Sequence, residues 1–112
     1  NNMTFLEYQQ EAHETSQDTK IGNDTLAYAV LGLSGESGEV ANKVKKIYRD
    51  GKGKVSPETK AALVKELGDC LWYIAEIATQ LGLNLDGIAA VNLTELRGRA
   101  LRGSINGSGD ER

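Results

Sequence analysis

Apolar residues recur at spacings of three and four along most of the chain, and no segment alternates between apolar and polar residues with a period of two. This periodicity is that of amphipathic helices, so the sequence predicts an all-α fold without a sheet. Residues that favour helix ends divide the pattern into four helices. They are expected from the cap Thr4 to about Gln17 or Thr19, from about Thr25 to about Asp50, from Pro57 to Leu81, and from Asn84 to about Leu101.

A short turn over residues 51–56 joins the second and third expected helices, and it contains two glycines and no periodic pattern. Ser56 followed by Pro57 is a typical helix start, because serine caps the first turn and proline fits the first helical position. Thr4 and Glu7 form the capping-box pattern at the start of the first helix. We therefore expect the second and third helices to form an antiparallel hairpin at the centre of the domain.

Two pairs of acidic residues lie on this hairpin, Glu36 with Glu39 and Glu66 with Asp69. Residues three apart project from one face of a helix. Counted from the turn, the two pairs differ by roughly 3 Å along the hairpin, at about 1.5 Å per residue, so they come level. Four carboxylates in one space repel each other unless a cation lies between them. An all-oxygen cluster suits Mg²⁺, with Mn²⁺ as a substitute, rather than zinc.

Acidic residues three apart are also common on solvated helix faces, where they need have no function. The matching register of the two pairs favours a site. An apolar stripe beside the acids of the third helix also favours one, because the stripe is expected to be buried. It consists of Leu67, Leu71, Ile74 and Ile77. A di-iron carboxylate site would instead need Glu-x-x-His pairs, and the chain has a single histidine.

The arrangement Glu36-x-x-Glu39 followed by Glu66-x-x-Asp69 resembles the ExxE…ExxD signature of the MazG-like all-α nucleoside triphosphate pyrophosphohydrolases. The surrounding stretch 31–46 is similar to the small single-domain members found in phages and integron cassettes. The resemblance implies a four-helix bundle-like domain over residues 1–102. Residues 103–112 are rich in glycine and serine and are expected to form a flexible tail, of which Asp110 and Arg112 could fold over a site.

The resemblance further implies Mg²⁺-dependent cleavage of (deoxy)nucleoside triphosphates to the monophosphate and pyrophosphate, as in the house-cleaning of nucleotide pools. In this reading Glu36, Glu39, Glu66 and Asp69 hold the metal, and either Glu36 or Glu39 also accepts the proton of the attacking water. Control of alarmone nucleotides is an open alternative role. A helical module that binds a nucleotide or a protein without catalysis is the alternative function.

Four further residues are candidates for substrate binding. Lys43 shares the face of Glu36, where it could hold a phosphate oxygen or merely pair with Glu39. In relatives, a tyrosine at the place of Tyr73 contacts the substrate, although the residue could equally be a core or rim aromatic. Asn92 and Arg99 match an Asn…Arg pattern that relatives use for phosphate or sugar contacts.

Relatives also place side chains of the first helix around the nucleobase, so Tyr8 or Gln9 could line that pocket. His13 is expected to be a partly exposed helical residue rather than a catalytic one, because no nucleophile partner suggests itself. Cys70 and Trp72 are expected to serve packing.

The formal net charge of −3 and the isoelectric point of about 5.1 argue against a nucleic-acid-binding surface as the main function. The sequence shows no apolar run of the roughly 20 residues that span a membrane and no signal-peptide pattern, so a cytoplasmic protein is expected. Residues 26–33 are apolar nearly all round, which one small monomer can hardly cover. A homo-oligomer, dimer or tetramer, is therefore expected.

Overall fold

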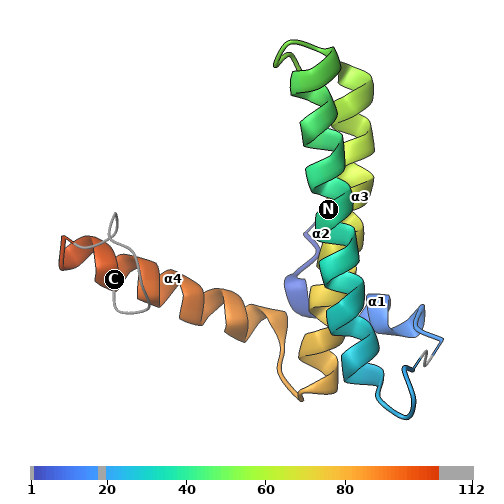
Figure 1. Cartoon of the computed structure of the whole chain (residues 1–112). Helices are drawn as coiled ribbons and strands as arrows, with labels where there is room; N and C mark the ends of the chain where they lie inside the picture. The colour runs from blue at the N-terminus through green and yellow to red at the C-terminus, as the bar shows by residue number, and fades with distance from the viewer. Residues whose placement is uncertain (1, 18–19, 104–112) are drawn as a thin grey trace.

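The structure is a computed structural model, and it describes residues 2–17 and 20–103. Four helices make up this part of the chain, which contains no strand beyond one isolated bridge between Ile21 and Asp24 (Figure 1). The all-α prediction is thus confirmed for the described residues. The helices are α1 (Phe5–Glu14), α2 (Thr25–Asp50), α3 (Pro57–Gln80) and α4 (Leu85–Leu101).

Helix α1 begins as predicted and ends earlier than predicted. The Thr4 side chain accepts a hydrogen bond from the Glu7 amide, and the Glu7 carboxylate accepts one from the Thr4 amide. At the other end the prediction of a helix to Gln17 or Thr19 was too long, and Thr19 itself lies outside the described residues. The Thr15 hydroxyl donates to the Ala12 carbonyl and so closes the last turn at Glu14.

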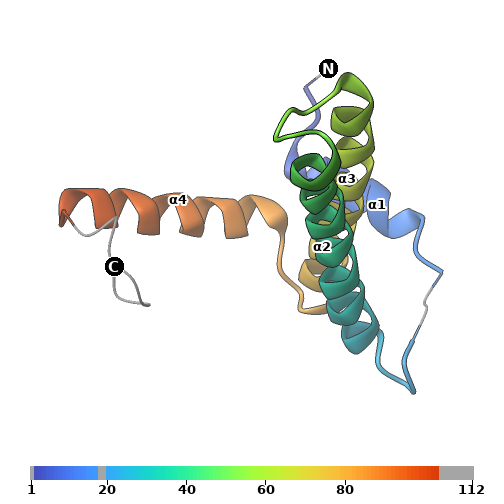
Figure 2. The same cartoon turned by 45° about the horizontal axis from the view of Figure 1, so that its top comes forward.

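Helices α2 and α3 form the predicted antiparallel hairpin and run side by side over most of their length in both views (Figures 1 and 2). The side chains of Asp24 and Ser56 cap their first turns. The turn between them places Lys52 and Gly53 in the left-handed region, with φ of 55° and 83°. This reversal directs α3 back along α2, so that residues far apart in sequence become neighbours.

Helix α4 does not complete a four-helix bundle with α1, α2 and α3, which corrects the bundle-like architecture expected for one chain. It contacts the start of the chain through α1 and then extends away from the hairpin (Figures 1 and 2). Gly82, with φ of 71°, allows the chain to change direction between α3 and α4. The described part of the chain therefore buries little: its central cluster consists of Ala75, Ala78 and Leu85 with Tyr8 packed against it.

Many large apolar side chains remain exposed as a result. The stripe beside the acids of α3 was expected to be buried, yet Leu67 is 56 % exposed and Ile74 is 37 % exposed. On α2, Val30 and Leu31 are exposed as well. The expectation of a buried stripe was therefore wrong for Leu67 and Ile74, whereas Leu71 and Ile77 are half-buried.

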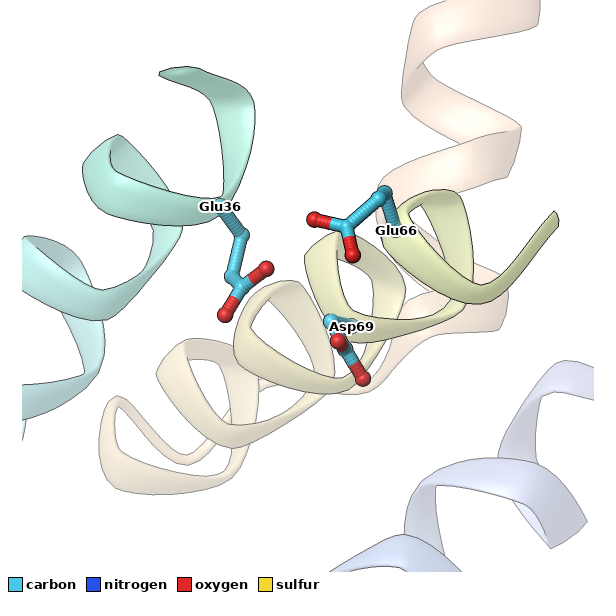
Figure 3. Close-up of side chains that lie close together, drawn as sticks. All are labelled: Glu36, Glu66 and Asp69. Atoms are coloured by element: carbon cyan, nitrogen blue, oxygen red, sulfur yellow. The ribbon is translucent and has the colours of Figure 1, made fainter. Parts of the chain in front are cut away.

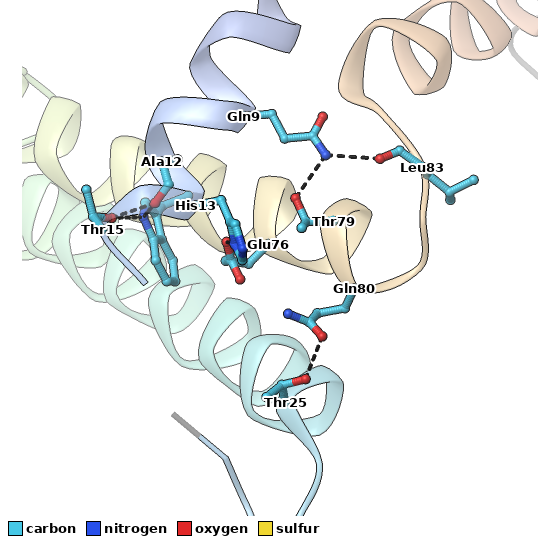
Figure 4. Close-up of polar contacts among 10 residues, drawn as sticks. Gln9, Ala12, His13, Thr15, Thr25, Glu76, Thr79, Gln80 and Leu83 are labelled. Carbon is cyan, nitrogen blue, oxygen red and sulfur yellow. Dashed lines mark hydrogen bonds and ion pairs between the residues drawn. The ribbon is translucent and has the colours of Figure 1, made fainter. Parts of the chain in front are cut away.

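Polar side chains fix α1 against the C-terminal half of α3 (Figure 4). The buried Gln9 amide nitrogen donates to the Thr79 hydroxyl and to the Leu83 carbonyl, each at 3.0 Å. Its oxygen accepts from the Leu85 amide at 2.9 Å. One side chain thereby holds α1, the end of α3 and the start of α4 together.

No helix within the described residues is long and apolar enough to cross a membrane. Of the predicted tail 103–112, only Gly103 is described, so the expectation for Asp110 and Arg112 falls outside the described residues.

Candidate metal centre

Three carboxylates from the two arms of the hairpin come together (Figure 3). Glu36 of α2 meets Glu66 and Asp69 of α3, and one carboxylate oxygen from each lies within 4.8 Å of those of the other two. Glu66 and Asp69 share a face because they are three residues apart, and the antiparallel register brings Glu36 opposite them. We refer to these three residues as the acid centre.

Glu39 is not part of the acid centre, although the sequence predicted four carboxylates in one space. Its side chain is exposed, and its charge nevertheless acts on Glu36. Three residues turn a helix by about 300°, so Glu39 is rotated by about 60° from the line on which Glu36 faces α3. The hairpin thus presents one acid of α2 and two of α3.

The acid centre is electrostatically unsatisfied. Partial desolvation, followed by repulsion from Asp69 and Glu66 and by a hydrogen bond with Glu66, raises the pKa of the Glu36 carboxyl. The Glu66 Oε2 atom is buried and has no hydrogen-bond partner in the described part of the chain. A buried oxygen without a partner is costly unless something outside the protein satisfies it. Three carboxylates at this spacing, one of which has an unpaired buried oxygen, fit a divalent cation such as Mg²⁺ or Mn²⁺.

A hollow of about 320 Å³ opens beside the acid centre, and it is lined by Glu36, Asp69, Trp72 and Tyr73. Trp72 and Tyr73 are in edge-to-face contact, with ring centroids 5.1 Å apart. The sequence prediction included Tyr73 and missed Trp72, which was assigned to packing. Its spacing from Asp69 was a usable signal, because residues at i+3 and i+4 both share the face of residue i.

Tyr73 is packed closely against α2. A Cβ atom at position 32 would overlap its ring, so glycine is needed there for the two helices to approach. The centroid of the Tyr28 ring, one turn before Gly32 on α2, lies 6.3 Å from that of the Tyr73 ring. Desolvation, then hydrogen bonding with Tyr28, then the charges of Glu36 and Asp69 raise the pKa of the Tyr73 hydroxyl above its usual value.

The first helix contributes less than relatives suggested. Tyr8 is near enough to Asp69 for that charge, after desolvation, to raise the pKa of the tyrosine hydroxyl. Gln9 does not line the hollow, because all its described hydrogen bonds go to Thr79, Leu83 and Leu85. Gln9 is therefore structural in this chain.

The sequence of residues 24–100 matches the MazG nucleotide pyrophosphohydrolase domain, and this range contains the whole acid centre. The chain belongs to the MazG family. It is also 49 % identical over 87 residues to the "Gene 37 protein" of Mycobacterium phage L5, an alignment that covers 78 % of this chain and 76 % of the phage protein. No solved structure gave a significant match.

Within this MazG chain, the other predicted substrate-binding residues do not line the hollow beside the acid centre. Lys43 lines a separate hollow of about 450 Å³ near the hairpin turn, together with Lys46 and Lys54. Asn92 is exposed on α4 beside an apolar hollow that Phe5 also lines. Arg99 lies further along α4, which extends away from the hairpin (Figure 1). One chain thus brings Tyr73, but not Lys43, Asn92 or Arg99, to the hollow beside the acids.

Proposed function

We propose that this chain is a divalent-metal-dependent nucleotide pyrophosphohydrolase that cleaves (deoxy)nucleoside triphosphates to the monophosphate and pyrophosphate, and so cleanses nucleotide pools. The observation that carries the proposal is the acid centre, in which Glu36, Glu66 and Asp69 converge within 4.8 Å. Membership of the MazG family supports the same reaction class.

In this proposal Glu36, Glu66 and Asp69 hold Mg²⁺ or Mn²⁺, which when bound supplies neutralisation of phosphate charge and activation of water. Glu39 stands one turn along α2 from the acid centre and is not committed to it. Of the two candidates for the base, it is therefore the carboxylate better placed to accept the water's proton. Tyr73 donates a hydrogen bond to the bound nucleotide, and the rings of Trp72 and Tyr73 shield one side of the hollow from water.

We further propose that the active form is a homo-oligomer, a dimer or a tetramer. The support is the extent of uncovered apolar surface: Val30 is 47 % exposed, Leu67 is 56 % exposed and Val91 is 65 % exposed. A second copy that covers these faces could also bring Asn92 and Arg99 of its α4 toward the acid centre. Their assignment to substrate binding rests on that arrangement.

The proposal is tested by incubating the protein with a panel of ribo- and deoxyribonucleoside triphosphates, with Mg²⁺ or with EDTA. Products are separated so that pyrophosphate is distinguished from inorganic phosphate. We expect monophosphate and pyrophosphate in equal amounts, only with metal. Binding of nucleotide without turnover would favour a non-catalytic module, and release of inorganic phosphate would contradict the proposed bond cleavage.

A further inference from the structure

The last turn of α1 is held by two side chains that stand four residues apart on α3 (Figure 4). The Trp72 indole nitrogen donates to the Ala12 carbonyl at 3.2 Å and to the Thr15 hydroxyl at 2.9 Å. Glu76 Oε1 lies 2.8 Å from His13 Nδ1. We call these contacts of Trp72 and Glu76 with residues 12–15 the α1 anchor.

Glu76 is an unusual residue for a purely structural contact. It is only 4 % exposed, while the His13 side chain that it meets is 45 % exposed. The separation of 2.8 Å between Nδ1 and Oε1 is that of a hydrogen bond. Burying such a pair gains little or no stability over well-packed apolar residues of similar volume. A benefit in orientation would explain why a carboxylate stands at this position.

What the α1 anchor orients is Trp72. Trp72 lines the hollow beside the acid centre. It also lines a small polar hollow of about 30 Å³, room for about one water, which Glu76 borders as well. Trp72 thus forms part of the wall of both hollows, and its indole is held by hydrogen bonds to a helix turn that Glu76 contacts through His13. If that turn moved, the wall of the larger hollow would move with it.

We propose that Glu76 and His13 are a positioning pair that fixes Trp72 as the wall of the nucleotide-binding hollow. The inference rests on the proposed function insofar as the hollow takes a nucleotide. The pair touches neither the acids nor the hollow itself, so it governs substrate affinity and leaves the chemical step unchanged.

The chain offers a direct reporter, because Trp72 is its single tryptophan. The test uses His13→Leu combined with Glu76→Leu, which removes the pair without leaving a buried charge. We expect native helix content, a redder Trp72 emission that acrylamide quenches at least twofold more strongly, and a KM raised about tenfold with kcat within twofold. The single variant His13→Gln, whose amide can still donate to Glu76, should keep all three properties near wild type.

The matched control is Glu14→Gln, which alters an exposed acid of the same helix end and should change nothing. Unchanged Trp72 emission and unchanged KM in the double leucine variant would overturn the positioning role, as would a fall in kcat with KM unchanged. The fluorescence readout is taken without nucleotide. A wild-type protein that turns over no nucleotide would therefore refute the proposed function, while the emission of the variants would still decide whether the pair positions Trp72.

Discussion

Helix α3 carries two acidic regions with opposite character. Glu66 and Asp69 lie in the acid centre, where Glu36 is repelled by its neighbours and Glu66 Oε2 has no hydrogen-bond partner in the described part of the chain. Two turns further on, Glu76 is more deeply buried and has His13 within 2.8 Å. The same helix thus carries one acid with an unpaired buried oxygen, Glu66, and one buried acid that has a hydrogen-bond partner, Glu76.

Whether a buried acid has a hydrogen-bond partner distinguishes a candidate functional site from a structural contact better than acidity or burial does. Buried polar groups in a folded chain are normally paired, because an unpaired one costs about 1–3 kcal/mol. Around the α1 anchor this rule holds: Gln9, Trp72 and Glu76 each have partners at 2.8–3.2 Å. In the acid centre it fails, which is expected of a site whose partner is a ligand.

The largest effect should follow from neutralising one ligand of the acid centre. We expect Asp69→Asn to reduce Mg²⁺-dependent turnover to well below a tenth of the wild-type rate, a loss of more than about 1.4 kcal/mol in transition-state stabilisation. The metal-free fold should be intact and at least as stable, because one repulsive charge is gone. Asp86→Asn, the same change on an exposed acid of α4, serves as the control. Activity above a tenth would refute the metal assignment.

The acid centre also differs from the α1 anchor in lying beside uncovered apolar faces. We expect Val30→Asp to weaken association of the chains and to lower activity at least tenfold, because a buried charge at the subunit contact would be unpaired. Sedimentation and turnover are measured on the same sample. Val55→Asp is the matched control, since Val55 is 48 % exposed in the hairpin turn against 47 % for Val30. A wild-type chain that is fully active as a monomer would rule out this prediction.

The hydrogen bonds of Gln9, which lies before the α1 anchor on the same helix, should affect the stability of the fold. Gln9→Ala removes three hydrogen bonds and strands the Leu83 carbonyl and the Leu85 amide. We expect the free energy of unfolding to fall by about 2–4 kcal/mol, judged from the cost of buried groups left unpaired. Chemical denaturation measures it, with Gln10→Ala at the exposed neighbouring position as the control. A loss no larger than that of the control would mean that these bonds do not hold α1.

Removing the charge of Glu36 should raise the stability of the metal-free protein, whereas Gln9→Ala lowers it. Its pKa is raised above the usual 4.5, so the folded state binds this proton more tightly than the unfolded state. The resulting stability is present below about pH 4.5 and is lost as the pH rises through the folded pKa. Metal-free Glu36→Gln should therefore melt at a higher temperature than wild type at pH 7, and this advantage should shrink toward pH 4. An advantage that is constant with pH would contradict the repulsion described for Glu36.

Most of the fold was predictable because helix ends are determined locally. Thr4 with Glu7, and Ser56 with Pro57, place two helix starts within one residue of those observed. The exception was the end of α1, where the Thr15 hydroxyl competes for the helix's own carbonyl. The path of α4 could not be read from the sequence, since nothing in its pattern says whether its partner is the same chain or another.

The site was predictable as far as register and spacing reach. These predicted that Glu36, Glu66 and Asp69 come together, but they could not show that Glu39 would lie outside this group, because that depends on the rotation of α2 against α3. Trp72 was assigned to packing, although its spacing of three residues from Asp69 was a usable signal. Its hydrogen bonds to Ala12 and Thr15, about sixty residues away, could not be predicted. Such long-range contacts leave no periodic signal.

Direct metal binding tests the central claim, that the acid centre is unsatisfied because it is a cation site. Mn²⁺ is titrated calorimetrically into the wild-type protein, Asp69→Asn and Asp86→Asn, without nucleotide. We predict that the wild type and Asp86→Asn bind Mn²⁺ equally and that Asp69→Asn binds at least tenfold more weakly. Equal affinity in all three proteins would show that the cation binds elsewhere and would contradict the account.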